Sequence, residues 1–277
     1  MEMGRELRGR KMKKLTLVKL GGSLITDKTK PYTVRWDVLK RLAKEIAEVW
    51  ENMKGSLIIG HGGGSFPHCS AKRYKVHLGV INEESYKGIA LVQNDASKLN
   101  RIVVEALIEA GVNAVSVQPS ASLICENGRI KEWYLEPLKI MLNLGLLPVP
   151  FGDVCLDRKM GCCIVSTEEI LYYLAKNLDV ERIILVGKVD GVFTGDPEKD
   201  KNAKLIKEIT PENFEEVKKF LGSSDGIDVT GGMLHKIERM LEIAKNGIIC
   251  EIINGLKENY LKRSLLGETG LGTVIRN

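Results

Sequence analysis

The sequence predicts an α/β protein in which parallel β-strands are joined by crossover helices. Short runs rich in Val, Ile and Leu alternate along the chain with longer stretches whose apolar residues repeat at helical spacing. This alternation is typical of a buried parallel sheet covered by amphipathic helices. Glycine turns follow several apolar runs, as at Gly21-Gly22 and Gly62 to Gly64, where strands are expected to end. With 277 residues, 44% of them hydrophobic, the chain can bury a large core around such a sheet.

In the first half of the chain, apolar runs predict the strands and helical repeats predict the helices. Strands are expected over 15–20, 56–60, 114–117 and 147–151, and helices over about 39–49, 91–110 and 136–144. Residues 121–135 are predicted to form a hairpin around Asn127-Gly128, because Asn-Gly favours the tight turn that joins antiparallel strands.

The second half continues the same alternation. Helices are expected over 167–178 and from Gly231-Gly232 to about 246, and strands over 182–186 and 247–253. Residues 194–226 are rich in Lys, Asp, Pro and Ser, so we predict a surface excursion there with one helix near 211–221.

The positive charge is concentrated at the start of the chain. Residues 1–14 hold six basic and two acidic side chains, which accounts for +4 of the net charge of +5. The remainder is therefore close to neutral. We expect residues 1–14 to be a solvated basic extension, residues 15–277 to form a single domain, and no nucleic-acid partner.

Composition also argues against membrane, secreted and zinc-binding proteins. No apolar run approaches the roughly 18 to 20 residues of a spanning helix, and no secretory leader is visible. We therefore expect a cytoplasmic protein with no membrane partner. The six cysteines contain no CxxC pair, which favours reduced and mostly buried thiols.

Three glycine turns suggest that the protein binds phosphate. They are Gly21-Gly22, Gly62 to Gly64, and Gly231-Gly232 at the start of a predicted helix. At the carboxyl ends of parallel strands, loops and helix N-termini direct backbone N–H groups outward. Glycine lets phosphate oxygens approach those amides, because a Cβ would hold them away. One glycine turn is usually only a tight turn, but three together favour an anion site.

Three lysines and one histidine lie beside these turns. Lys19 directly precedes the first turn, Lys28 follows nine residues later, and Lys236 lies one helical turn into the third. Phosphoryl transfer needs such cations to neutralise charge on the reacting oxygens. Lys19 is the strongest candidate because it ends an apolar strand, where an unpaired charge is costly. His68 can hold a phosphate that is not being broken, whereas His61, on a strand end, is expected to be structural.

These residues resemble the motifs of the amino-acid kinase family over nearly the whole chain from residue 15. The motifs are 19–23 with Lys28, 61–66 with His68, 116–120, 152–153, 189–192 and 227–233 with Lys236. The histidine after the triple-glycine turn resembles, more narrowly, the branch of isopentenyl phosphate kinases. The resemblance implies a three-layer α/β/α sandwich with a mainly parallel central sheet, the acceptor held by residues 15–150 and ATP by residues 151–277. It also implies a homodimer and Mg²⁺ carried by ATP, with no metal ligands from the protein.

The same resemblance implies a direct, in-line transfer of the terminal phosphoryl group of ATP to isopentenyl phosphate, a step of isoprenoid biosynthesis. Catalytic roles are implied for Lys19, Lys28, His68 and Lys236. Nucleotide contacts are implied for Lys19, Gly21, Gly22, Ser23, Gly64, Lys188, Asp190, Gly232 and Lys236. Acceptor contacts are implied for Gly63, Gly64, His68, Gly152 and Thr167.

Five positions depart from the family pattern and leave alternatives open. Pro67 and Thr167 stand where glycine is usual, Phe151 where histidine is common, and Glu168 and Lys188 where aspartate is usual. One alternative is a sibling kinase for another acceptor, such as fosfomycin. Another is a catalytically silent nucleotide-binding protein. A dinucleotide oxidoreductase is disfavoured, because the first turn lacks the GxGxxG spacing.

Overall fold

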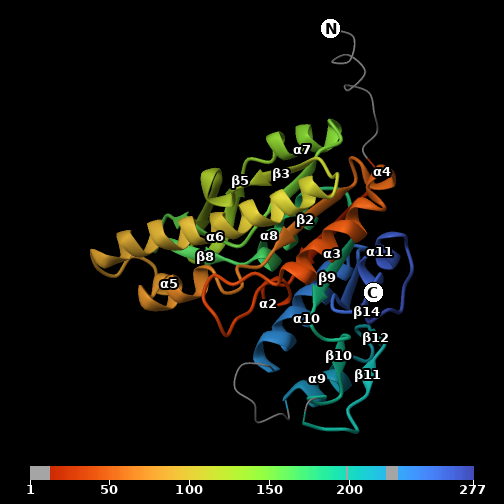
Figure 1. Ribbon diagram of the computed structural model, residues 1–277. Helices are drawn as coiled ribbons and strands as arrows, with labels where there is room; N and C mark the ends of the chain where they lie inside the picture. The colour runs from red at the N-terminus through yellow and green to blue at the C-terminus, as the bar shows by residue number, and fades with distance from the viewer. Residues whose placement is uncertain (1–12, 198, 223–229) are drawn as a thin grey trace.

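The computed structural model describes residues 13–197, 199–222 and 230–277 (Figure 1). Its centre is a six-stranded sheet in the order β12-β14-β13-β9-β1-β2. The strands are β12 (Glu208–Ile209), β14 (Thr273–Ile275), β13 (Ile249–Asn254), β9 (Val180–Gly187), β1 (Leu15–Leu20) and β2 (Leu57–His61). All neighbouring pairs are parallel except β13 and β14. The prediction of a mainly parallel central sheet is therefore confirmed.

Two further strands extend this sheet beyond β2. β3 (Ala114–Val117) and β6 (Leu147–Pro150) pair in parallel. An isolated parallel bridge between His61 and Phe151 connects this pair to the end of β2. The carboxyl ends of β1, β2, β6 and β9 therefore lie along the same edge of the sheet.

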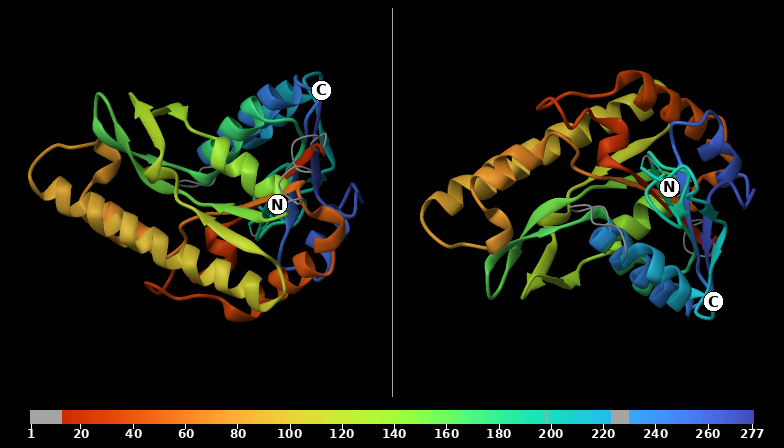
Figure 2. Two further views of the ribbon diagram at one scale, coloured as in Figure 1. Left: turned by 90° about the horizontal axis from the view of Figure 1, so that it is seen from above. Right: turned by 90° about the horizontal axis from the view of Figure 1, so that it is seen from below.

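Helices cover both faces of the sheet, so the predicted three-layer sandwich is confirmed. α3 (Trp36–Ala47), α6 (Glu84–Glu109) and α11 (Tyr260–Leu265) pack on one face, and α8 (Thr167–Asn177), α9 (Phe214–Gly222) and α10 (Thr230–Ala244) on the other. Figure 2 shows α6 and α10 on opposite sides of the strands. Along β1, Leu15 and Leu17 join the core under α8 and α10, whereas Val18 and Leu20 join the core under α3 and α6. Because β1 is buried on both faces, apolar residues predominate along it on both sides.

A second, four-stranded sheet in the order β5-β4-β7-β8 contains a hairpin that we did not predict. The predicted hairpin is present as β4 (Leu123–Glu126) and β5 (Arg129–Trp133), with positive φ at Asn127 and Gly128. The missed strands are β7 (Asp153–Asp157) and β8 (Gly161–Val165), which pair antiparallel. Their apolar stretches are short, contain three buried cysteines (Cys155, Cys162 and Cys163), and leave the apolar Leu156 and Ile164 exposed.

The remaining elements connect these layers. They are α2 (Gly22–Ile25), α4 (Trp50–Met53), α5 (Pro67–Arg73), η1 (Val76–Leu78), η2 (Pro119–Ala121), α7 (Glu136–Asn143), β10 (Val192–Phe193) and β11 (Leu205–Ile206). The predicted surface excursion over 194–226 contains β11, β12 and α9, and its last residues lie outside the described part. α11 and β14 were not predicted. Most of the basic extension, residues 1–12, also lies outside the described part.

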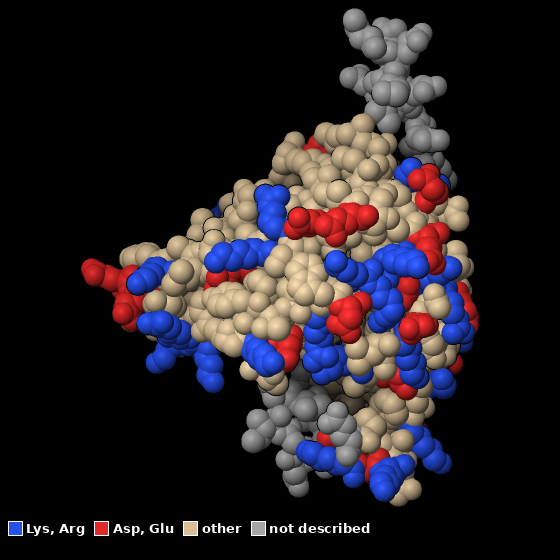
Figure 3. All heavy atoms as spheres, viewed as in Figure 1, with Lys and Arg blue, Asp and Glu red and all other residues tan. Residues whose placement is uncertain are grey.

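The described surface carries charge of both signs. On the face shown in Figure 3, Lys and Arg side chains are interspersed with Asp and Glu. Among the residues that the structure describes, no helix combines the length and the apolar character needed to cross a bilayer. All six cysteines are free thiols, and all but Cys69 are buried.

Candidate active site

A cavity of about 680 Å³ lies at the carboxyl ends of the central strands. It brings together most of the residues singled out from the sequence. Those that line it are Lys19, Gly21, Gly22, Ser23, Lys28, Gly63, Gly64, His68, Gly152, Thr167, Lys188 and Lys236. The four residues with implied catalytic roles therefore share one space, although they come from β1, the loop after α2, α5 and α10.

Lys19 reaches the cavity because of its position on β1. The alternation of the strand places it on the same face as Leu15 and Leu17, which is the face covered by α8 and α10. There its Nζ makes an ion pair with Oε1 of Glu168, in the first turn of α8. The Nζ of Lys236, on α10, lies 3.5 Å from the same oxygen. Glu168 thus joins two lysines that approach from opposite sides.

The charges of this cluster shift one another's pKa. Burial lowers the pKa of Lys19, and repulsion from Lys236 and Lys28 adds to this, against the attraction of Glu168. Burial alone would raise the pKa of Glu168, but Lys19 and Lys236 outweigh it and hold that pKa below its usual value. Glu168 is therefore ionised at neutral pH. It stands where aspartate is usual in the family pattern, and its carboxylate pairs with both lysines.

The first two glycine turns pack directly against each other, which the sequence did not reveal. A Cβ on Gly22 would lie 2.3 Å from the amide nitrogen of Gly64. Gly64 itself has φ +56, and a Cβ there would lie 2.1 Å from Oγ1 of Thr26. Any side chain at these positions would separate the turns. Glycine is therefore required for the approach of one turn to the other, in addition to any approach of a ligand.

The amides of the two turns differ in what they can still bind. The N–H of Gly21 donates to the carbonyl of Val186 at 2.8 Å, so it is not free for a ligand. Within the described residues, the amides of Gly22, Gly63 and Gly64 have no hydrogen-bond acceptor. These three N–H groups, beside the lysines, are the backbone donors that an anion in the cavity could use.

His68 and Lys28 stand at another part of the cavity wall. His68 is the second residue of α5 and is exposed to the cavity. Partial burial and the nearby charge of Lys28 lower its pKa, against a hydrogen bond with the backbone of Gly64. His68 is therefore held next to both the second glycine turn and Lys28.

His61 is structural, as predicted. It is buried, its Nε2 lies 3.1 Å from Nδ2 of Asn100, and its ring stacks on Phe151 with centroids 5.7 Å apart. Burial lowers its pKa to about 4, so the ring is neutral. Phe151, which departs from the family pattern, supplies this stacking partner.

Thr167 uses its hydroxyl within the protein. It donates to the carbonyl of His61 at 2.6 Å and is buried at the start of α8. Its methyl group faces Gly60, where a Cβ would lie 2.6 Å away. Thr167 therefore links the start of α8 to the end of β2 by a hydrogen bond. Its hydroxyl proton is used in this bond and is not available to a ligand.

Two predicted nucleotide contacts are not placed in the cavity. The carboxylate of Asp190 accepts hydrogen bonds from Asn254 and Lys257, both at 2.9 Å, and Asp190 is not among the lining residues. Gly232 lies in the first turn of α10, beside residues 223–229 outside the described part. Its contact with nucleotide stays a prediction.

The cavity also contains charged residues that we did not select from the sequence, namely Lys72, His77 and Asp153. Lys72 lies one helical turn after His68 on α5, and that spacing could have identified it. Asp153 is buried, accepts a hydrogen bond from the amide of Ser120 at 3.2 Å, and has its pKa raised by burial. Among the described residues, no three His, Cys, Asp or Glu side chains are grouped so as to hold a metal ion.

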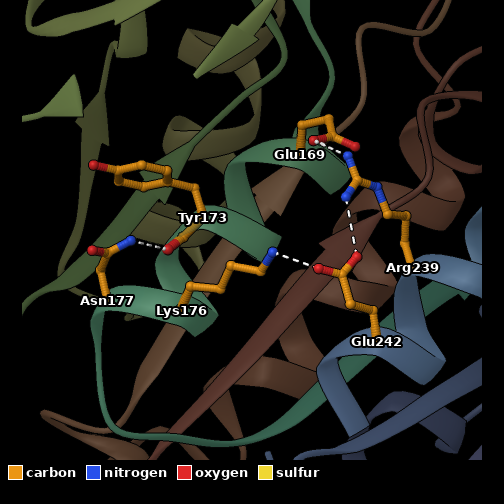
Figure 4. Close-up of polar contacts among 6 residues, drawn as sticks. All are labelled: Glu169, Tyr173, Lys176, Asn177, Arg239 and Glu242. Atoms are coloured by element: carbon orange, nitrogen blue, oxygen red, sulfur yellow. Dashed lines mark hydrogen bonds and ion pairs between the residues drawn. The ribbon is translucent and has the colours of Figure 1, made fainter. Parts of the chain in front are cut away.

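A network of ion pairs aligns the two helices that carry Glu168 and Lys236 (Figure 4). Arg239 on α10 contacts Glu169 on α8 at 3.4 Å and Glu242 at 3.2 Å. Glu242 in turn contacts Lys176 of α8 at 2.8 Å. Because Glu169 adjoins Glu168 and Arg239 follows Lys236 by three residues, the network links α8 and α10 close to these two cavity residues.

Known proteins similar in sequence identify the family of this chain. The profile of the amino acid kinase family matches residues 14–254. The chain belongs to the amino acid kinase family. It is 38% identical to the isopentenyl phosphate kinase of Methanothermobacter thermautotrophicus, over 94% of this chain and 98% of that protein. It is 37% identical to the isopentenyl phosphate kinase of Methanocaldococcus jannaschii, over 92% and 96% of the two chains.

Solved structures of family members agree with the fold described above. A structure described as an X-ray structure of isopentenyl phosphate kinase superposes with a TM-score of 0.80 and 35% identity, covering 94% of this chain and 99% of the other. The amino acid kinase fold predicted from the sequence is thereby confirmed.

Proposed function

We propose that this member of the amino acid kinase family is an isopentenyl phosphate kinase, which converts ATP and isopentenyl phosphate into ADP and isopentenyl diphosphate. The observation that carries the proposal is the convergence of Lys19, Lys28, Lys236 and His68 on one cavity that also has an apolar end. Similarity to proteins of that name over more than nine-tenths of the chain supports it.

The cationic part of the cavity suits the donor. Lys19 and Lys236 flank Glu168, and Lys28 adds a third charge near them. These amines neutralise the phosphates of ATP and the moving phosphoryl group, and the amides of Gly22 and Gly64 add donors. Magnesium bound through the nucleotide phosphates would share that neutralisation.

The rest of the cavity suits an alcohol monophosphate. His68 and the amide of Gly63 hold the acceptor's own phosphate. Beyond them, Ala71 on α5 and Val92 on α6 pack around a small apolar cluster, and Ile164 on β8 pairs with Val154 of that cluster. A short hydrocarbon chain is favoured there, because a polar tail would lose its hydration without gaining hydrogen bonds.

The reaction needs no covalent intermediate with the protein. An oxygen of the acceptor phosphate forms a bond to the terminal phosphorus of ATP while the bond from that phosphorus to the bridging oxygen breaks. The electron pair leaves with ADP. Both partners are anions, so the protein's main task is to hold them in line and offset their repulsion.

A coupled assay of ADP release tests the proposal. Purified protein is given ATP with isopentenyl phosphate, dimethylallyl phosphate or fosfomycin in parallel. We expect isopentenyl phosphate to give the highest kcat/KM. Faster turnover of fosfomycin would identify a sibling kinase instead, and binding of ATP without ADP release on any acceptor would favour a silent nucleotide-binding protein.

Three further expectations from the family belong to this proposal. Residues 15–150 mainly hold the acceptor and 151–277 mainly the nucleotide, although β7 of the second part pairs with β4 of the first. The protein forms a homodimer, which sedimentation equilibrium would test. It acts in the cytoplasm, where ATP is supplied.

A further inference from the structure

Asp95 is a buried acid outside the cavity that connects three segments of the chain. It lies on α6 and is 3% exposed. Its Oδ2 accepts hydrogen bonds from the hydroxyl of Tyr32 at 2.8 Å and from the hydroxyl of Ser70 at 2.9 Å. The Nζ of Lys98 lies 3.6 Å from its other oxygen. Through these hydrogen bonds, the Asp95 carboxylate links two other segments to α6.

The first of these segments is the loop between α2 and α3, which carries Lys28. Tyr32 has φ +53, in the left-handed region that a tyrosine avoids unless its surroundings hold it there. Its ring meets Phe66 edge-on with centroids 5.5 Å apart, and its N–H donates to the carbonyl of Ser65 at 3.3 Å. Asp95 accepts the bond at the tip of this side chain, so it helps to fix the loop.

The second segment is α5, which carries His68 in its first turn. α5 has only seven residues, too few to be stable alone, so its position depends on what it packs against. Ser70 is buried on the side of α5 that faces α6, and its hydroxyl is the group that Asp95 binds. The acid therefore fixes the helix as well as the loop.

We propose that Asp95 is a positioning residue. It holds the loop that carries Lys28 and the helix that carries His68, and so fixes where these two side chains stand in the cavity wall. The proposal rests on the function proposed above for those two residues. A buried carboxylate without partners is costly, so it stays in place only where donors meet it. Here both donors come from the segments that carry cavity residues. Asp95 itself does not line the cavity.

Separate variants break the two connections. We expect Tyr32→Phe to lower kcat about tenfold with the acceptor KM within about twofold of wild type, because displaced catalytic groups chiefly affect the transition state. Ser70→Ala should raise the acceptor KM about fivefold and leave the KM for ATP unchanged, because His68 binds the ground-state acceptor. Asp95→Asn should combine both effects.

Glu45→Gln is the matched control. Glu45 is another buried helical carboxylate, 4% exposed, that accepts hydrogen bonds from the backbone of Asn259 and Lys262, pairs with Arg41, and does not line the cavity. It should lower the melting temperature without either kinetic change. If all four variants lose only thermal stability, or if Glu45→Gln reproduces the kinetic changes, the positioning role is overturned.

A second readout does not depend on activity. The pKa of His68 is followed by proton NMR, with its signal assigned through His68→Gln. Lys28 lowers that pKa, so Lys28→Ala sets the largest rise that can be expected. Tyr32→Phe keeps the charge of Asp95 but releases the loop, and it should give part of the same rise. A raised pKa of His68 in Tyr32→Phe would support the proposal, and an unchanged one would overturn it. Both outcomes can be read even if the wild-type protein proves inactive toward isopentenyl phosphate.

Discussion

The two cationic regions of the cavity are built in different ways. Lys19 and Lys236 stand on a central strand and a long helix, and they share the buried carboxylate of Glu168. Lys28 and His68 stand on a loop and a short helix, have no such shared ion pair within the described residues, and depend on hydrogen bonds to Asp95 outside the cavity. The sheet itself fixes the first region. The second is fixed by Tyr32 and Ser70, whose hydrogen bonds to Asp95 hold the loop and the short helix in place. We therefore expect the first to determine the chemical step and the second to align the acceptor.

The largest effect is expected for Lys19→Ala. Removal of the amine should lower kcat by on the order of 10² or more, because it acts on charge that develops in the transition state. Folding should persist, since Lys236 remains beside Glu168. Steady-state kinetics and thermal unfolding measure both quantities, with Lys44→Ala on the exposed side of α3 as the control. Turnover near the wild-type value would remove Lys19 from the chemistry.

Glu168→Gln should have the next largest effect. Without the carboxylate, Lys19 and Lys236 repel each other, and we expect kcat to fall by about tenfold or more as the lysines move apart. If kcat stays within about twofold of wild type, Glu168 does not organise the lysines.

The same variant changes how stability depends on pH. The folded-state pKa of Glu168 lies below its usual value of 4.5. Its contribution to stability is therefore present above that value and is lost as the pH falls through the folded-state pKa. Urea unfolding at several pH values should show that wild type loses more free energy of unfolding than Glu168→Gln as the pH is lowered from 5. Parallel curves would contradict the shift.

His68→Ala should separate the two regions by kinetics. We expect the acceptor KM to rise about tenfold or more while the KM for ATP changes by less than about twofold, because the imidazole binds the acceptor phosphate. His61 offers no useful control, because it is buried in the core. His235→Ala serves instead, because His235 is exposed on α10 and does not line the cavity. A larger change for ATP than for the acceptor would move the acceptor phosphate away from His68.

The smallest effect is expected for Arg239→Met, which breaks the network between α8 and α10. Its ion pairs are partly exposed, and such pairs contribute about 0 to 1 kcal/mol each. We expect kcat to fall two- to threefold, roughly the consequence of a slightly loosened Lys236. Raising the salt concentration should reduce the difference from wild type. A loss as large as that of Glu168→Gln would mean that the network is part of the chemistry.

Much of the central sheet could be predicted from the sequence, because its strands are buried on both faces and appear as continuous apolar runs. β7 and β8 were not predicted, because their apolar stretches are short and are made partly of cysteines. Lys19 was identified because a charge at the end of such a run requires a partner. Its partner, Glu168, lies 149 residues further along the chain, and only the fold brings them together.

The contacts that hold Lys28 and His68 in place could not be predicted from the sequence either. Tyr32 and Asp95 are 63 residues apart, and neither belongs to a motif. The sequence indicated that glycine was needed at Gly22 and Gly64, but the contact between their turns appears only in the folded chain. For Asp190, the motif suggested a nucleotide contact, which stays a prediction, and the hydrogen bonds from Asn254 and Lys257 to its carboxylate appear only in the fold.

Phosphorus NMR of a single reaction mixture tests the central claim most directly. Protein, ATP, magnesium and isopentenyl phosphate are combined, and the phosphorus signals are followed with time. Our account predicts that the monophosphate signal is replaced by the two coupled signals of an organic diphosphate, in equal amount with ADP. Consumption of ATP with release of inorganic phosphate, or no change in the monophosphate signal, would contradict it.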